Sequence, residues 1–123
     1  MKISVNIIAN PDAGDEALAR LFNAFALAHE ANQAGDEVAL TFIGTGTRWP
    51  ERLSKLDHPA NALYNELRPF VKGASRSCAT RWGTAETNQQ LGLKLLDENK
   101  VRGPVGGISL RHFLEDGWQT LIF

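Results

Sequence analysis

Cys78 is the single cysteine of this chain, and it stands in the segment whose residue types are best suited to chemistry. Residues 73–83 read Gly-Ala-Ser-Arg-Ser-Cys-Ala-Thr-Arg-Trp-Gly, follow a strand-like run and are expected to open a short helix that ends at Gly83. A thiol at a helix N-terminus beside arginines is placed where its thiolate is stabilised. The sequence therefore makes this sulfur the first candidate nucleophile. The alternative is packing, since free cysteines are often buried as small hydrophobic residues.

Two arginines flank the thiol and are candidates for binding a substrate. Arg81 lies three residues after Cys78, a spacing that brings both near the same face of a helix. Arg76 and Arg81 could hold a sulfur oxyanion, a phosphate or a carboxylate of a partner, or they could be solvated surface charges. Ser75, at the end of the preceding strand-like run, joins them as a candidate substrate-binding residue.

Two tryptophans are expected near the same rim. Trp49 follows the second expected strand, and Trp82 follows the short helix that carries Cys78. Their rings could shield a thiolate or persulfide from water, or they could pack in the core or in a subunit interface.

The segment Gly44-Thr45-Gly46-Thr47-Arg48 is the one glycine-rich loop that directly follows an expected strand. Its backbone N–H groups could hold an anion, which makes Gly46 a candidate site residue. The segment lacks the Gly-Lys-Ser/Thr ending of a P-loop and does not complete a Gly-x-Gly-x-x-Gly motif. A plain turn is the simpler interpretation.

Hydrophobic periodicity predicts strands that alternate with helices. Strands are expected at 3–9, 38–43, 70–75 and 118–123, helices at 16–34, 51–56, 61–67, 84–90 and 108–115, loops at 44–50 and 101–107, and either more helix or a short strand at 92–96. This alternation is typical of one α/β domain, residues 1–123, built as a three-layer α/β/α sandwich with a mainly parallel sheet of about five strands.

In such sheets, ligands bind beyond the carboxyl ends of the strands. Three loops leave those ends, at 10–14, 44–50 and 75–78, and are expected to converge on one rim. This convergence makes Asn10 a candidate site residue beside Cys78.

Composition limits the classes of function. A chain of 123 residues with 43% apolar residues and a net charge of -1 shows no electrostatic sign of binding nucleic acid or an anionic membrane. One cysteine forms no internal disulfide, no Cys/His cluster suggests a metal site, and no cofactor motif is complete. The apolar start of the chain is too short for a signal peptide, so a cytoplasmic protein is expected.

Several segments together carry a family likeness. They are the first strand, the alanine-rich helix that ends at Gly35-Asp36-Glu37-Val38, the strand Ala39-Leu40-Thr41-Phe42-Ile43 with its Gly-x-Gly loop, Cys78 after the third strand, and the closing residues 114–123. Through these segments the chain resembles the DsrE/DsrF-like family, which includes the TusD-type sulfur-relay subunits. The likeness is greatest to the small standalone members.

The resemblance implies an α/β/α sandwich that assembles as homotrimers or homohexamers and carries sulfur on the matching cysteine as a persulfide. By this resemblance Cys78 accepts sulfane sulfur and passes it on. The chain departs from the relay members at Gly44-Thr45-Gly46-Thr47, where they often have an acidic residue, glycine and valine. It also has no resolving cysteine, so a partner protein or a small thiol is expected to take the sulfur.

Three hypotheses for function follow. The leading one is a cytoplasmic, oligomeric sulfur carrier or sulfurtransferase-like protein with a sulfur donor and an acceptor. The second is a non-enzymatic binding module for a small anionic or nucleotide-like ligand. The third is an oligomeric scaffold subunit whose aromatic surface serves assembly.

Overall fold

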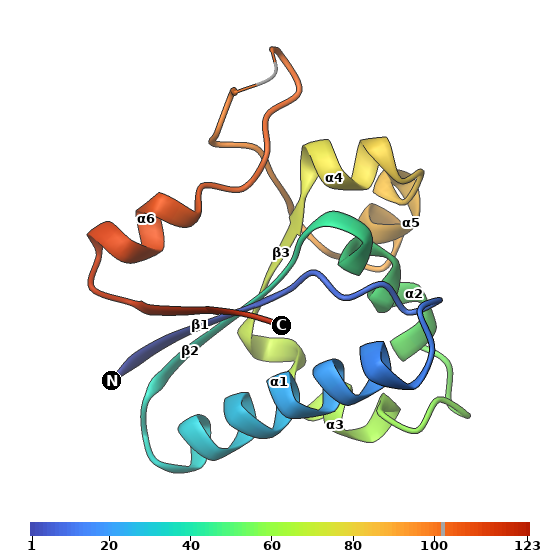
Figure 1. Cartoon of the computed structure of the whole chain (residues 1–123), viewed down its shortest axis with the longest axis vertical. Coiled ribbons are helices and arrows are strands. Elements are labelled where there is room, and N and C mark those ends of the chain that lie inside the picture. The colour runs from blue at the N-terminus through green and yellow to red at the C-terminus, as the bar shows by residue number, and fades with distance from the viewer. Residues whose placement is uncertain (102) are drawn as a thin grey trace.

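A single parallel sheet forms the centre of the protein. The computed structural model describes residues 1–101 and 103–123, and its sheet has the strand order β4-β3-β2-β1-β5 (Figure 1). The strands are β1 (Lys2–Ile7), β2 (Glu37–Phe42), β3 (Val71–Ser75), β4 (Leu95–Leu96) and β5 (Gln119–Ile122). All four neighbouring pairs are parallel, which confirms the expected α/β fold with five strands. Of the ambiguous segment 92–96, residues 95–96 form a strand.

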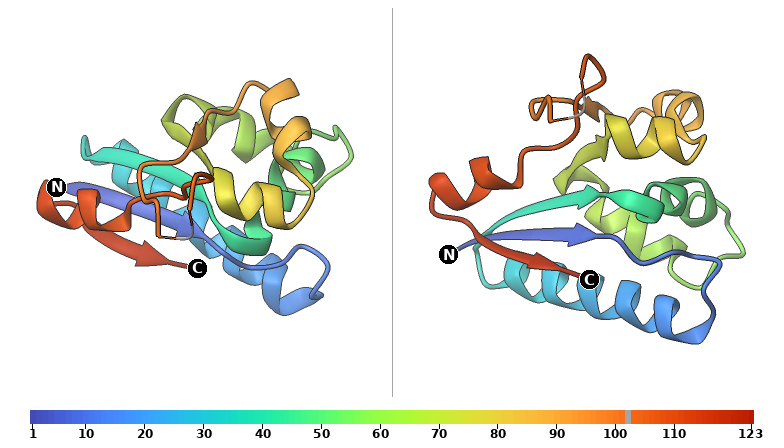
Figure 2. Two further views of the ribbon diagram at one scale, coloured as in Figure 1. Left: turned by 90° about the horizontal axis from the view of Figure 1, so that it is seen from above. Right: turned by 45° about the horizontal axis from the view of Figure 1, so that its top comes forward.

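Helices lie on both faces of the sheet. They are α1 (Asp15–Gln33), α2 (Trp49–Leu53), α3 (Asn61–Leu67), α4 (Arg76–Arg81), α5 (Ala85–Gln90) and α6 (Leu110–Glu115), with the short 3₁₀ helices η1 (Gly44–Arg48) and η2 (Arg68–Phe70). Figure 2 shows α1 and α3 on one face, and α6 with the chain that precedes it on the other. In the described part of the chain, no helix is both long and apolar enough to cross a membrane.

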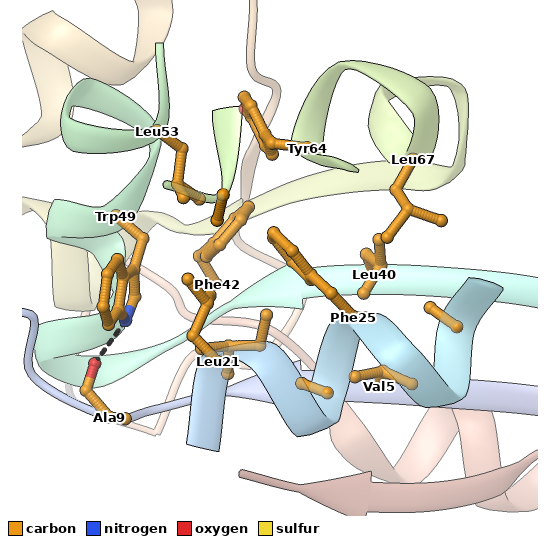
Figure 3. Close-up of a cluster of buried hydrophobic side chains, with 14 of the residues drawn as sticks. Val5, Ala9, Leu21, Phe25, Leu40, Phe42, Trp49, Leu53, Tyr64 and Leu67 are labelled. Atoms are coloured by element: carbon orange, nitrogen blue, oxygen red, sulfur yellow. Dashed lines mark hydrogen bonds between the residues drawn. The ribbon is translucent and has the colours of Figure 1, made fainter. Parts of the chain in front are cut away.

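The main core lies between the sheet and the pair α1 and α3 (Figure 3). Leu40 and Phe42 of β2 face Phe25 of α1 and Tyr64 of α3, and all four are buried. The Tyr64 ring stacks on Phe25 at a centroid distance of 6.2 Å and meets Phe42 edge-on at 6.3 Å. Small buried residues let α1 approach the sheet closely: Ala17, Ala24, Ala28 and Ala31.

The opposite face of the sheet is polar at its centre. The buried Asn6 amide donates to the Ser4 hydroxyl at 2.9 Å and to the Leu121 carbonyl at 3.2 Å. The Thr41 hydroxyl donates to the Asn6 side-chain oxygen. Because each of these buried groups has a partner, the strands β1, β2 and β5 are tied together without a hydrophobic layer at this point.

The expectation of a loop over residues 44–50 is wrong. The segment forms η1 and runs directly into α2, where Pro50 occupies the first turn. The Thr47 hydroxyl donates to the Gly44 carbonyl at 2.9 Å and accepts a hydrogen bond from Thr84 at 3.0 Å. Asn88 of α5 donates to the Thr47 carbonyl at 3.1 Å. These contacts order the glycine-rich segment and fix it against the chain that follows α4.

One prediction concerns His58, which packs edge-on against the Trp49 ring at 6.2 Å. Its Nδ1 accepts a hydrogen bond from the backbone N–H of Ala60 at 3.0 Å, so the ring must be unprotonated there. Burial lowers the pKa of His58 below its ordinary 6.5; the charge of Arg52 adds to this and that of Asp57 opposes it.

The unfolded chain therefore takes up a proton at His58 more readily than the folded chain, and stability falls as the pH drops through about 6.5. Urea unfolding at about pH 7.5 and pH 5 measures this. His58→Asn keeps an acceptor for the Ala60 N–H but does not titrate, so it should reduce the pH-dependent loss. An unchanged loss in this variant would show that His58 does not contribute.

Candidate functional site

Cys78 lies in the first turn of α4, three residues beyond the end of β3, and is partly exposed. The chain passes from strand to helix at Ser75, whose backbone is extended and whose side chain does not cap α4. Instead, the Ser75 hydroxyl accepts a hydrogen bond from the Ile108 N–H at 3.1 Å. The Ser77 N–H donates to the Gly106 carbonyl at 3.0 Å. The start of α4 is thus held by the chain that leads to α6.

The segment that packs against the start of α4 is closed by a pair of backbone hydrogen bonds. Asn99 and Gly107 exchange two backbone hydrogen bonds, each 2.8 Å long. At Gly107 the backbone passes so close to α4 that an added Cβ would lie 2.6 Å from the Ser77 hydroxyl oxygen. A side chain at this position would require the Ser77 and Ser75 hydroxyls, 2.6 Å and 3.0 Å from the added Cβ, to move away.

Two cavities meet at Cys78. The larger has a volume of about 700 Å³ and is lined by Ser77, Cys78, Thr80, Arg81, Trp82, Asn99, Val101, Val105 and Gly107. The smaller, of about 380 Å³, shares Ser77, Cys78, Asn99, Val101 and Gly107 with it and extends to Ile8, Ile43, Gly44, Ser75 and residues 108–111. Both are open to solvent. The thiol therefore has space around it that a small molecule could fill.

Two guanidinium groups lie against the ring of Trp82, which lines the larger cavity. Arg81 stacks on it with 4.6 Å between the guanidinium carbon and the ring centroid, and Arg48 lies at 5.6 Å. Arg48 also donates to the Asn10 side-chain oxygen at 3.2 Å and lies 3.9 Å from an Asp12 carboxylate oxygen. Such contacts orient the indole and keep positive charge beside it.

Four of the residues expected at the site from the sequence line these cavities. Cys78, Arg81 and Trp82 line the larger one, and Ser75 lines the smaller one. Arg76 starts α4 but is paired with Asp97, with 3.7 Å between its Nε and a carboxylate oxygen. It lines neither cavity.

The expected place of Trp49 at the rim is wrong. Its side chain is 2% exposed, and its indole N–H donates to the Ala9 carbonyl at 2.7 Å (Figure 3). Trp49 belongs to the core because α2 begins at this residue and turns the ring inward. The alternative of core packing is the one that the structure confirms.

Gly46 and Asn10 line neither of the cavities at Cys78. Gly46 is buried, and its N–H donates to the Ile43 carbonyl at 2.9 Å, so it does not present a free N–H to an anion. Asn10 lines a separate hollow at the start of α1. Its side-chain oxygen is occupied by Arg48 and by the Asp12 N–H. Of the three loops at the carboxyl ends of strands, 44–50 and 75–78 contribute residues to the cavities at Cys78, whereas 10–14 does not.

Several residues that line the larger cavity were not predicted from the sequence. Asn99, Val101 and Val105 come from a segment with no periodicity, which predicts a loop but not where the loop folds. The two-hydrogen-bond contact between Asn99 and Gly107 is a tertiary feature. The glycine and proline content of 103–107 is the one signal that a close approach was possible.

None of the three histidines lines either cavity. His29 forms a 2.8 Å contact with Glu66, and His58 lies with Trp49 beside α2. His112 lies on α6 in a different hollow. Among the described residues, no histidine lines the cavities at Cys78, so a Cys–His pair is not formed there.

Comparison with known proteins adds no family assignment. No model of a protein family matches the chain, and no match is found among curated proteins or among solved structures.

Proposed function

We propose that this protein is a sulfur carrier, in which Cys78 accepts sulfane sulfur as a persulfide and passes it to a second thiol. The observation that supports this most is the position of Cys78, partly exposed at the junction of two open cavities at the carboxyl ends of β2 and β3. The resemblance to the DsrE/DsrF-like family points to the same cysteine.

The surroundings suit this chemistry. The Cys78 thiolate would attack the outer sulfur of a sulfane donor, forming a new S–S bond while the donor leaves with the electron pair of its broken bond. Val101, Val105 and Trp82 would place apolar side chains beside the resulting persulfide. Arg81, one helical turn away, lines the same cavity.

Sulfur loading tests this proposal. The folded protein is incubated with a polysulfide, desalted and weighed by intact mass spectrometry. We expect an added mass of one sulfur atom that dithiothreitol removes, and no such addition on Cys78→Ser, because no other thiol is present. A wild-type protein that stays unloaded while a known carrier loads in parallel would refute the proposal.

A binding module for a small anion is the second candidate. It is favoured by the stacked pair of Arg81 and Trp82 at the cavity mouth, which could hold an anionic group without any reaction at the sulfur. In that case Cys78→Ser should bind the ligand as well as the wild type does, and Arg81→Gln should not.

Self-association is part of the proposal as well. The edge strand β5 carries Leu121 and Ile122, which are 40% and 55% exposed, and it contains no charged residue to discourage pairing. Sedimentation velocity would show whether the protein forms a trimer or hexamer. A cytoplasmic location also remains a proposal, which localisation of the tagged protein in cells would test.

A further inference from the structure

Among the described arginines, Arg81 is the one that lines the larger cavity together with Cys78. Arg48 is held by Asn10 and Asp12, and Arg76 is paired with Asp97. Arg81 is exposed, and its guanidinium stacks on the Trp82 ring; within residues 1–101 and 103–123 no carboxylate lies within ion-pair distance of it. The larger cavity therefore has a free guanidinium on one wall.

The remaining walls of this cavity are largely apolar. Val101 is 78% exposed, Val105 is 41% exposed and Trp82 is 36% exposed, although each is a large hydrophobic side chain. All three line the larger cavity. Covering these exposed apolar side chains with an apolar molecule would remove their surface from water, which is energetically favourable.

Cys78 and Arg81 both line this largely apolar space and lie about one helical turn apart on α4. Their spacing along α4 places their Cβ atoms about 5–6 Å apart, and the Arg81 side chain extends the separation further. A ligand that touches both needs a sulfur at one end, an anion at the other and an apolar body between them. The cavity volume of about 700 Å³ suits a small molecule.

We propose that the acceptor of the sulfur is a small thiol with an apolar body and one terminal carboxylate, bound in the larger cavity with the carboxylate on Arg81. This inference rests on the proposed function, since it names the acceptor of that same site. The larger cavity is open to solvent and large enough for a small thiol to enter and reach Cys78.

The transfer step balances without an external oxidant or reductant. The thiolate of the acceptor attacks the outer sulfur of the Cys78 persulfide and forms a new S–S bond. The bond between that sulfur and Cys78 Sγ breaks, and its electron pair stays on Sγ as a thiolate. The persulfide proton moves with the transferred sulfur, so the products are an acceptor persulfide and free Cys78.

The experiment compares mercaptohexanoate with its neutral amide as acceptors from protein loaded with sulfur. For wild type we expect kcat/KM for the acid to exceed that for the amide by about tenfold, the usual effect of one charge-assisted contact. Arg81→Gln should remove this preference. Arg20→Gln is the matched control because Arg20 is exposed on α1 and paired with Glu16, and it should keep the preference. Equal rates for acid and amide with wild type, or the same loss in Arg20→Gln, would overturn the inference.

A sulfur-free probe separates this inference from the proposed function. Hexanoate is titrated into Cys78→Ser while the indole N–H signal of Trp82, assigned with Trp82→Phe, is followed by NMR. Saturable binding that Arg81→Gln weakens about tenfold supports the anion site even if Cys78 never accepts sulfur. Normal sulfur loading of wild type with no hexanoate binding and no acid preference would refute the small-thiol acceptor and leave the carrier function standing.

Discussion

Trp49→Ala is expected to lower the free energy of unfolding by about 3–5 kcal/mol, the range for removing a large buried aromatic side chain. The indole is 2% exposed and lies with Leu53 in the core next to Phe42 (Figure 3). Its loss also leaves the buried Ala9 carbonyl without its 2.7 Å hydrogen bond. Both effects act at the point where β1 leaves the sheet and α2 begins.

Urea unfolding followed by circular dichroism measures this change. Trp82→Ala is the matched control, since Trp82 is 36% exposed at the cavity mouth and should cost about 1 kcal/mol or less. Trp49→Phe keeps most of the buried volume but not the hydrogen bond, and should fall between the two. Similar losses for Trp49→Ala and Trp82→Ala would contradict the assignment of Trp49 to the core.

Gly46→Ala is expected to destabilise the fold by about 3 kcal/mol or more, although it adds a single methyl group. The new Cβ would lie 2.1 Å from the Ile7 carbonyl oxygen and 2.8 Å from its carbon. Both are backbone atoms at the end of β1, so no side-chain rotation relieves the clash. Either η1 or β1 must shift, and the hydrogen bonds of Thr47 with Thr84 and Asn88 would shift with it.

Gly83→Ala is the control for the Gly46 prediction. Gly83 has a φ of +72° and open space around its Cβ position, so alanine there costs only the backbone strain of about 1 kcal/mol. Thermal unfolding of the two variants compares the loss of stability caused by a steric clash with the loss caused by backbone strain. A Gly46→Ala protein as stable as Gly83→Ala would show that η1 is not packed against β1 as described.

The fold was accessible from the sequence because its buried strands and long helix have distinct patterns. The apolar run 38–43 predicted a strand buried on both faces, and β2 occupies the central position between β1 and β3. Leu21 and Phe25 recur at helical spacing on α1 and are both buried. The short strand β4 has only two residues, too few for periodicity to separate it from a helix.

The candidate site was only partly accessible. Cys78, Arg81 and Trp82 share one short helix and its C-terminal residue, so local spacing was enough to group them. Trp49 was placed wrongly because a glycine-rich segment favours a loop, whereas the Thr47 contacts with Thr84 and Asn88 turn it into helix. Those partners lie about forty residues away, and local patterns do not reveal such contacts.

A single-turnover transfer experiment shows whether Cys78 carries sulfur. The protein is loaded with isotopically labelled sulfane sulfur, freed of donor and mixed with mercaptohexanoate. Labelled sulfur is then quantified over time on Cys78 and on the small thiol. We expect label to leave Cys78 at the rate at which labelled acceptor persulfide appears. Label that never enters Cys78, or that enters and does not move to any thiol, would contradict this expectation.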